Sequence, residues 1–318
     1  MRGEMSMCNK VLLDNTGKPN MMVRIPKFKL SDVIPGAADV THPAFIVDGA
    51  EIDEIYISQY QNAIIDGKAY SLPFQRPGVK VNFDTARELC AAKGPGWHLM
   101  TNAEWAAVAL LSKKNNTLPR GNNHWGCDYS HRGEKGVVFD DCKILTGSGP
   151  AAWSHDHTPY GIFDLNGNVW EWVSGLRLLD GEIQIIEGNN AAKPIDLSLA
   201  SDEWKPILLG DKNLKYALTD NGVKLTTEDA GEDWGGTKFM DLETDIQVPD
   251  IAKALALFPA DDAKFTDYFW ADCEGESLPI RGGGWNDAAY AGVFSLYLDN
   301  ARTDSSNSIG FRSAYIPV

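Results

Sequence analysis

The chain has 318 residues, of which 43% are apolar and 10% aromatic, and its formal net charge is −15 at pH 7. This size and composition exclude a disordered tail or a fibrous repeat, and they allow a large core without disulfides or a structural metal. Because the negative charge would repel phosphate groups, we expect neither nucleic acid nor an anionic membrane as a partner.

The cysteines and the apolar runs indicate in which cellular compartment the protein is made. The five cysteines are scattered and form no CxxC pair, which favours reduced thiols over a disulfide framework. No apolar run approaches the roughly 20 residues that span a bilayer, and the first residues lack the apolar core of a signal peptide. We therefore expect cytoplasmic synthesis without a signal peptide, and no membrane insertion.

Residues 1–44 consist of short alternating apolar and polar runs and end in the turn-rich sequence PGAADVTHP. This pattern predicts a short β-rich N-terminal segment suited to attachment. Residues 45–60 then carry isoleucines spaced for one or two half-buried strands, and we place the start of the main domain, 45–318, here.

Two short helices are predicted. The first covers residues 83–92, where Asp84 and Thr85 supply capping chemistry at the N-terminus. The second begins at a capping box formed by Thr101 and Glu104 and continues through the apolar run that follows.

The remaining chain is predicted to be loops and strands. Residues 113–154 show little periodicity and are expected to form long ordered loops. Residues 176–280 form a strand-rich inserted segment with hairpin signals at Asp180-Gly181 and at Asn221-Gly222. The fold class expected is α+β.

The most specific run is YGIFDLNGNVWEWV, residues 160–173. Its Asn-Gly-Asn sequence predicts a tight turn leading into a strand, on which Trp170 and Trp172 share one face and Glu171 points the other way. Carboxylates at 164 and 171 with free turn carbonyls could wrap Ca²⁺. The alternative is a purely structural turn in which backbone amides satisfy Glu171.

Three further motifs accompany this run: WHLMTNAEW at 97–105, RGGGW at 281–285 and IGFR at 309–312. Together, and in this order, they resemble the formylglycine-generating-enzyme-like (sulfatase-modifying factor) superfamily. The resemblance spans about residues 45–318 and implies a C-type-lectin-like fold with two short helices, twisted antiparallel strands and long loops. In the family, the residues matching Asp164, Gly167, Val169 and Glu171 form a calcium site; no other cofactor is implied for this chain.

The catalytic features of the superfamily are missing. In the formylglycine-generating enzymes two cysteines shortly after RGG bind copper, and the aligned positions here are Asp287 and Gly292, while Cys273 lies upstream without a partner. The iron-dependent members use a separate histidine-bearing helical domain, for which residues 1–44 are too short. We therefore expect no enzyme activity, with an oxidase of altered site as the alternative.

The C-terminus has an unusual composition. The chain contains 19 Lys, 15 Glu, 5 Gln and 7 Met, yet residues 281–318 contain none of these, where about five or six would be expected. The tail from Arg281 to Arg312 resembles the variable region of proteins diversified by a retroelement, in which both adenines of AAC codons are randomised. Such codons never encode Lys, Glu, Gln, Met or Trp.

The positions matching the template asparagines all carry permitted residues: Gly284, Asn286, Asp287, Ala288, Tyr290, Ser295, Tyr297, Asp299, Asp304, Ser306, Asn307 and Ser308. Fixed residues alternate with them, so that in Ser295 to Asp299 the leucines are expected to point inward and the variable side chains outward. Chance absence of long side chains from a Gly- and Ser-rich end is the alternative explanation.

These observations favour a receptor-recognition protein that binds a cell-surface protein or glycan through residues 284–308. Tyr290 and Tyr297 are the expected anchors, because tyrosine offers a large contact area at low entropic cost. The expected carrier is a virion, such as a phage tail, joined to other virion proteins through the N-terminal segment. The other alternative is a structural tail protein without variable binding.

Overall fold

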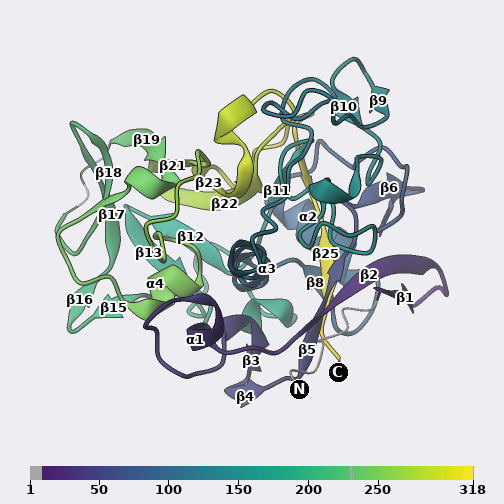
Figure 1. Ribbon diagram of the computed structural model, residues 1–318. Helices are drawn as coiled ribbons and strands as arrows, with labels where there is room; N and C mark the ends of the chain where they lie inside the picture. Colours follow the sequence, from purple (N-terminus) through teal and green to yellow (C-terminus); the bar gives the residue numbers. More distant parts are fainter. Residues whose placement is uncertain (1–8, 230, 232, 318) are drawn as a thin grey trace, which may run out of the picture.

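The computed structural model describes residues 9–229, 231 and 233–317 (Figure 1). One sheet has five strands in the order β1 (Asn9–Leu13), β2 (Pro19–Pro26), β5 (Glu54–Ser58), β25 (Ser313–Tyr315) and β8 (Trp97–Leu99). Strands from the expected N-terminal segment thus pair, through β5, with the last strand of the chain. Cys8 lies outside the described residues.

The second sheet has twelve strands. Its main path runs β19 (Trp234–Lys238), β21 (Tyr268–Asp272), β23 (Gly292–Asn300), β22 (Glu276–Gly282), β12 (Leu176–Leu179), β13 (Glu182–Ile185), β17 (Lys215–Thr219), β18 (Gly222–Thr226) and β20 (Glu243–Thr244). Beside this path lie β11 (Trp170–Trp172), β14 (Lys205–Pro206) and β24 (Ile309–Phe311). The inserted segment therefore supplies most of this sheet.

Short elements complete the described chain. The paired two-stranded ribbons are β3 (Ile46–Val47) with β4 (Ala50–Glu51), β6 (Ala63–Ile65) with β7 (Lys68–Tyr70), β9 (Val138–Phe139) with β10 (Lys143–Ile144), and β15 (Leu208–Leu209) with β16 (Lys212–Asn213). The 3-10 turns are η1 (Pro43–Phe45), η2 (Ala151–Trp153), η3 (Asn190–Ala192), η4 (Phe239–Asp241) and η5 (Ala288–Tyr290). As expected, residues 113–154 are mostly loop.

Four α-helices occur in the described part of the chain: α1 (Leu30–Val33), α2 (Phe83–Ala91), α3 (Asn102–Lys114) and α4 (Asp250–Ala254). The capping box of Thr101 and Glu104 at α3 is confirmed. At α2 the expected capping residues were wrong by a few positions, because the side chain of Asn82 accepts the Thr85 N–H and lies just before the helix. A polar residue there satisfies a backbone donor that the helix cannot.

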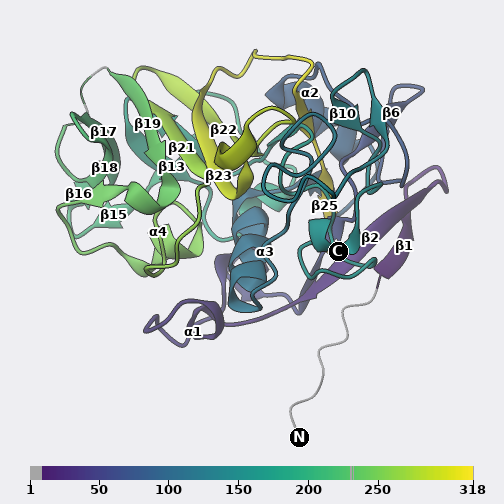
Figure 2. The same ribbon diagram turned by 45° about the horizontal axis from the view of Figure 1, so that its top comes forward.

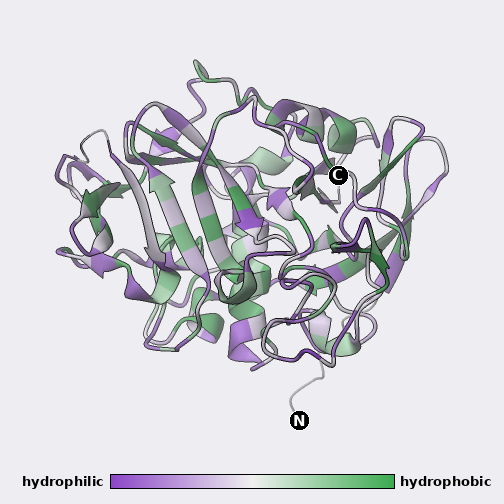
Figure 3. Cartoon of the chain, turned by 90° about the horizontal axis from the view of Figure 1, so that it is seen from above, coloured by the Kyte–Doolittle hydropathy of each residue, from purple (hydrophilic) through white to green (hydrophobic). Residues whose placement is uncertain are grey.

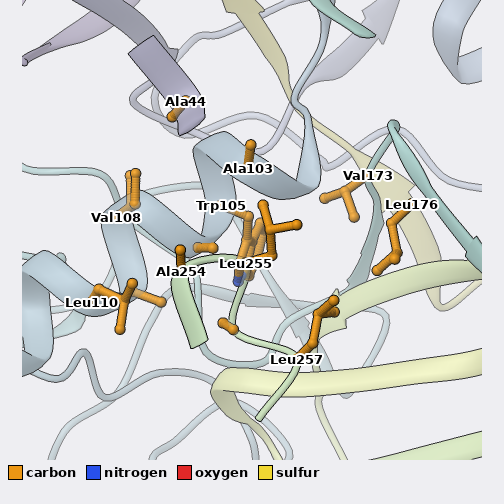
Figure 4. Close-up of a cluster of buried hydrophobic side chains, with 14 of the residues drawn as sticks. Ala44, Ala103, Trp105, Val108, Leu110, Val173, Leu176, Ala254, Leu255 and Leu257 are labelled. Carbon is orange, nitrogen blue, oxygen red and sulfur yellow. The ribbon is translucent and has the colours of Figure 1, made fainter. Parts of the chain in front are cut away.

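Helix α3 lies between the two sheets in both ribbon views (Figures 1 and 2). Its residues 102–112 are all buried, as expected for a helix that is covered on every side. Trp105 of this helix packs with Val173, Leu176 and Leu255 in one apolar cluster (Figure 4). The Trp105 indole N–H donates to the carbonyl of Val293 at 2.8 Å, which ties the helix to β23.

The two predicted hairpins form, one of them with a shifted turn. Asp180 and Gly181 connect β12 and β13 with φ values of 50° and 73°, as in a type I′ turn. Between β17 and β18, however, Thr219 pairs with Gly222, so Asp220 and Asn221 form the turn. Gly222 is needed for a different reason, since a Cβ there would lie 2.9 Å from the Thr237 Cβ.

Bands of polar and apolar residues alternate along the strands of the larger sheet (Figure 3). Such alternation is what places one set of side chains in the core and the other at the surface. Among the described helices, none is both long and apolar enough to cross a bilayer.

Candidate functional site

The WEW strand and the GFR strand are joined by a buried ion pair. The Arg312 guanidinium donates two hydrogen bonds to the Glu171 carboxylate, at 2.7 and 2.6 Å, and both side chains are almost fully buried. Two further donations, to the carbonyls of Ser58 and Phe163, connect Arg312 to neighbouring segments. The motif residues therefore act together as a cross-link within the scaffold.

Several of the oxygens expected to bind calcium already accept hydrogen bonds. The side-chain amide of Gln61 donates to the carbonyls of Asp164 and Val169, at 3.2 and 2.9 Å, and to the Glu171 carboxylate at 3.0 Å. These donors compete with a cation, whereas the buried Asp164 Oδ1 has no hydrogen-bond partner within the described residues, so the calcium site stays a prediction. Among the described residues, no cluster of three or more His, Cys, Asp or Glu side chains is placed to hold a metal.

Contacts within the scaffold also involve Asp164 and Gly167 of the expected calcium site. Asp164 accepts the Gly147 N–H at 2.8 Å, and burial raises its pKa to about 6, so its carboxyl binds a proton readily. Gly167 has a φ of 82°, and a Cβ on it would lie 2.2 Å from the carbonyl oxygen of Asn122. The tight turn predicted around Gly167 is thus confirmed, together with its requirement for glycine.

The RGG arginine is also buried. The Arg281 guanidinium donates to Asn102 Oδ1 at 3.0 and 2.7 Å and to the carbonyls of Leu255 and Ala256 at 3.2 Å. Burial lowers its pKa to about 9. Arg281 therefore anchors β22 to the start of α3 and the end of α4, beneath the segment predicted to vary.

The predicted variable positions fall mostly at the surface. Exposed side chains are Asn286, Tyr290, Asp304 and Asn307, and half-buried ones are Asp287, Ala288, Tyr297, Asp299, Ser306 and Ser308. The intervening fixed residues that are buried are Ala291, Gly292, Leu296, Leu298, Ile309, Gly310, Phe311 and Arg312. The predicted inward direction of Leu296 and Leu298 is confirmed.

Two of the positions differ from expectation. Ser295 is buried, because its hydroxyl donates to the Tyr290 carbonyl at 2.5 Å and the η5 turn covers it. Gly284 is buried as well, but a Cβ there would meet the Asp287 carboxylate and the Trp170 ring at about 3.4 Å, an ordinary contact distance. A small side chain fits at 284 without rearrangement, whereas a large one at 295 would displace the η5 turn.

Trp170 of the WEW motif joins three parts of this region. Its ring lies 4.2 Å from that of Tyr297, its side chain and the Asp287 carboxylate both border Gly284, and its backbone N–H donates to the Ser308 carbonyl at 2.8 Å. Positions 287, 297 and 308 are therefore brought together over one fixed, buried residue. We use the term variable face for the exposed and half-buried predicted positions named above.

The variable face continues onto strands that sequence reasoning did not assign to the site. Strand β21 pairs with β23 and brings Tyr268 and Trp270 next to it, and β19, on the other side of β21, adds Trp234. Tyr268 lies 4.7 Å from Tyr290, and Trp270 lies 6.2 Å from Tyr297, measured between ring centroids. The sequence YFWAD places Tyr268 and Trp270 on one face of a strand, but it does not indicate with which strand this one pairs.

The cysteine and the two positions that correspond to the copper site lie in ordinary structural settings. Asp287 accepts the Gly284 N–H at 2.7 Å, and Gly292 packs so closely on Asp267 that a Cβ would come within 2.1 Å of its carboxylate. Cys273 is buried and its thiol donates to the Tyr216 carbonyl at 3.3 Å. Burial raises the pKa of the Cys273 thiol to about 11.

Comparison with known proteins gives the following similarities. Residues 2–206 match the family model described as sulfatase-modifying factor enzyme 1-like domain. The inactive C-alpha-formylglycine-generating enzyme 2 of Bos taurus is 31% identical over 120 residues, covering 35% of this chain and 37% of that protein. The chain thus matches little more than a third of that relative's length.

Solved structures with a similar chain course include PvdO from Pseudomonas aeruginosa, at 15% identity and a TM-score of 0.43, with 96% of this chain and 97% of that one covered. Treponema denticola variable protein 1 is 14% identical with a TM-score of 0.40, covering 98% and 100% of the two chains. The Major Tropism Determinant U1 variant is 12% identical with a TM-score of 0.34, covering 93% and 62%.

The family match covers well over half of the chain and includes the WHLMTNAEW and NGNVWEW motifs, whose residues build the scaffold described above. The described strands and few short helices agree with the α+β architecture expected from those motifs. The chain belongs to the sulfatase-modifying factor enzyme 1-like domain family and has its C-type-lectin-like fold.

Proposed function

We propose that this protein is a non-enzymatic ligand-binding protein that recognises a receptor on a cell surface through its variable face, which a retroelement diversifies. The observation that carries the proposal is the division of the C-terminal segment by burial. Ten of the twelve predicted variable positions reach the surface, while the fixed leucines and glycines between them are buried. Changes at the surface positions would leave the core intact.

The composition of the segment supports diversification. Residues 281–318 lack Lys, Glu, Gln and Met even though many of their side chains are solvent-exposed, where long polar residues are normally common. Packing does not explain this absence, because exposed positions accept long side chains. Randomised AAC codons do explain it, because they cannot encode these four residues.

The site chemistry supports binding rather than catalysis. The positions of the copper cysteines hold Asp287 and Gly292, and the buried Cys273 thiol has too high a pKa to supply a thiolate near neutral pH. The variable face contains Tyr, Ser and Asn, which give binding loops their contact area and adaptable hydrogen bonds.

Attachment through the N-terminal strands is part of the same proposal. Strand β1 is an edge strand, and its Val11 and Leu13 are exposed although they are apolar. An exposed apolar edge is a surface on which another chain can add a strand. We propose that this edge joins the protein to other virion proteins, such as those of a phage tail.

The proposal is tested with a displayed library of the full chain in which the twelve predicted variable positions are randomised with NNC codons. A matched library randomises twelve exposed positions in residues 9–70. After panning on intact bacterial cells, binders are expected from the first library alone, and restoring the original residues at 290 and 297 should abolish their binding. Equal enrichment from both libraries would contradict the proposal.

A further inference from the structure

Next to the variable face lies a pocket of about 470 Å³ lined by Trp234, Trp270, Asp272, Tyr297 and Asp299. Resting on the proposed function, we propose that this pocket is a subsite for a cationic group of the ligand, an ammonium or guanidinium, and that the inserted segment holds this preference constant while the variable positions change. We call it the cation subsite.

Strand pairing places the rings on one face of the sheet. Trp270 of β21 lies directly opposite Tyr297 of β23, and Trp234 of β19 lies directly opposite Asp272 of β21. The Trp270 ring is 6.2 Å from that of Tyr297 and 5.4 Å from that of Trp234, with planes inclined by 40° and 33°. Three aromatic rings from three strands thus surround one point on the surface.

A glycine makes this arrangement of rings sterically possible. Gly236 pairs directly with Trp270, and a Cβ at this position would lie 2.2 Å from Cε3 of Trp270 and 2.6 Å from Cε1 of Tyr268. Any other residue would push the rings away from the β19 backbone. The absence of a side chain at Gly236 therefore lets the rings of Trp270 and Tyr268 pack directly on the backbone of β19. The position of Trp270 at the surface is fixed by this packing.

The charge of the pocket selects the class of ligand. Two of its five lining residues are carboxylic acids, Asp272 and Asp299, and none is Lys or Arg. Within the described part of the chain neither carboxylate forms a salt bridge; Asp272 accepts the Glu274 N–H at 3.0 Å and Asp299 accepts the Asn300 side-chain amide at 2.8 Å. Burial, with a contribution from the charge of Asp272, raises the pKa of Asp299 to about 6, so an added positive charge would relieve an existing electrostatic cost.

Aromatic faces attract cations through the ring quadrupole at centroid distances within about 6 Å, and nearby carboxylates add to the attraction. A neutral sugar would also stack on the rings and could donate its hydroxyls to the carboxylates, but only a cation would neutralise the two like charges. Lys238, the one lysine on β19, lies opposite Tyr268 at the far end of the strand pair from Asp272. The pocket therefore lies at the end of the strand pair that carries Asp272, and Lys238 lies at the other end.

Three of the lining residues, Trp234, Trp270 and Asp272, lie outside the diversified segment, whereas Tyr297 and Asp299 are within it. Diversification can thus alter one wall of the subsite but leaves the other wall unchanged. Proteins that differ at the variable positions are expected to differ in affinity and detail while they continue to prefer ligands with a positive charge at this point.

The experiment titrates the full-length protein, labelled with 5-fluorotryptophan, with tetramethylammonium and separately with neopentyl alcohol, a neutral molecule of similar shape. Fluorine NMR should show saturable shifts of the Trp234 and Trp270 resonances, assigned from Trp→Phe variants, with tetramethylammonium only. Asp272→Asn should weaken the binding at least threefold and Trp270→Ala should abolish it. The control Tyr160→Ala removes an exposed aromatic ring elsewhere and should change nothing.

Equal binding of the two probes, or tetramethylammonium binding that Trp270→Ala does not affect, would overturn the cation subsite. A titration with methyl β-glucoside that shifts the same resonances more strongly than tetramethylammonium would assign the pocket to sugars instead. The panning experiment reports separately on the variable face: binders that depend on position 290 without tetramethylammonium binding would refute only the ligand class, whereas failure of panning would refute the proposed function.

Discussion

The ring of Trp170 in β11 packs against that of Tyr297 in β23 in a tilted arrangement, with centroids 4.2 Å apart and planes inclined at 39°. A fixed motif residue thereby supports a residue predicted to vary. Trp170 also lies close to position 287 and hydrogen-bonds the backbone at position 308, so one fixed side chain supports three positions of the variable face. This contact explains how a surface can change its side chains without changing the position of its backbone.

Trp170→Ala is expected to destabilise the protein by about 3 kcal/mol, because a buried indole leaves a large cavity. Urea unfolding measures this loss. Trp125→Ala removes an exposed indole and should change the free energy of unfolding by less than about 0.5 kcal/mol. Similar losses for the two variants would mean that Trp170 does not support the face as described.

Breaking the buried pair of Arg312 and Glu171 is expected to cost about 3 kcal/mol or more, since Glu171→Gln leaves a guanidinium buried without its counter-charge. Glu228→Gln breaks the exposed pair with Lys212 and should cost at most about 1 kcal/mol. The comparison is made by urea unfolding at neutral pH. A small effect at Glu171 would contradict its assignment as a scaffold cross-link.

Calcium is expected to leave the melting temperature unchanged, because Gln61 and Arg312 already donate to the carbonyls of Asp164 and Val169 and to the Glu171 carboxylate, with which a calcium ion would have to compete. The measurement compares thermal unfolding with excess EGTA and with 1 mM CaCl₂. A calcium-dependent rise of several degrees that disappears in Glu171→Gln would restore the calcium site implied by the family resemblance.

Asp267 should make stability pH-dependent. Its carboxylate accepts the Phe294 N–H at 2.7 Å, and burial raises its pKa to about 7. A carboxyl whose pKa is higher in the folded than in the unfolded state favours folding when protonated, so its contribution is complete below about pH 4 and is lost as the pH rises to about 7.

Asp267→Asn keeps an acceptor but removes the titration, so the variant should gain on the order of 2 kcal/mol relative to wild type between pH 5 and pH 8. Chemical unfolding of both proteins across this range measures the difference. If the two stabilities stay parallel, Asp267 does not titrate in the folded protein as described.

Features that depend on neighbouring residues could be predicted from the sequence. The capping box of Thr101 and Glu104 and the turn at Gly167 follow from side-chain chemistry within a few positions, and both are confirmed. The inward direction of Leu296 and Leu298 follows from the period of a strand. These local rules placed ten of the twelve predicted variable positions at the surface, the exceptions being Gly284 and Ser295.

Features that depend on distant contacts could not be predicted. Gln61 donates to Glu171 across 110 positions, and a calcium ion would have to compete with this donor. The parallel pairing of β21 with β23, which places Trp270 beside Tyr297, joins segments with no local signal of their partnership. The turn between β17 and β18 was misplaced because Gly222 serves close packing on Thr237 rather than the turn itself.

The central claim is that residues 284–308 form a changeable binding face on a constant scaffold. Sequencing this locus in many members of one population tests it most directly. We predict substitutions confined to the twelve named positions, all within the set of residues encoded by NNC codons. We also predict that a near-identical template copy and a reverse-transcriptase gene lie next to this locus. An invariant tail, or substitutions spread evenly over residues such as Leu296, Leu298 and Phe311, would contradict it.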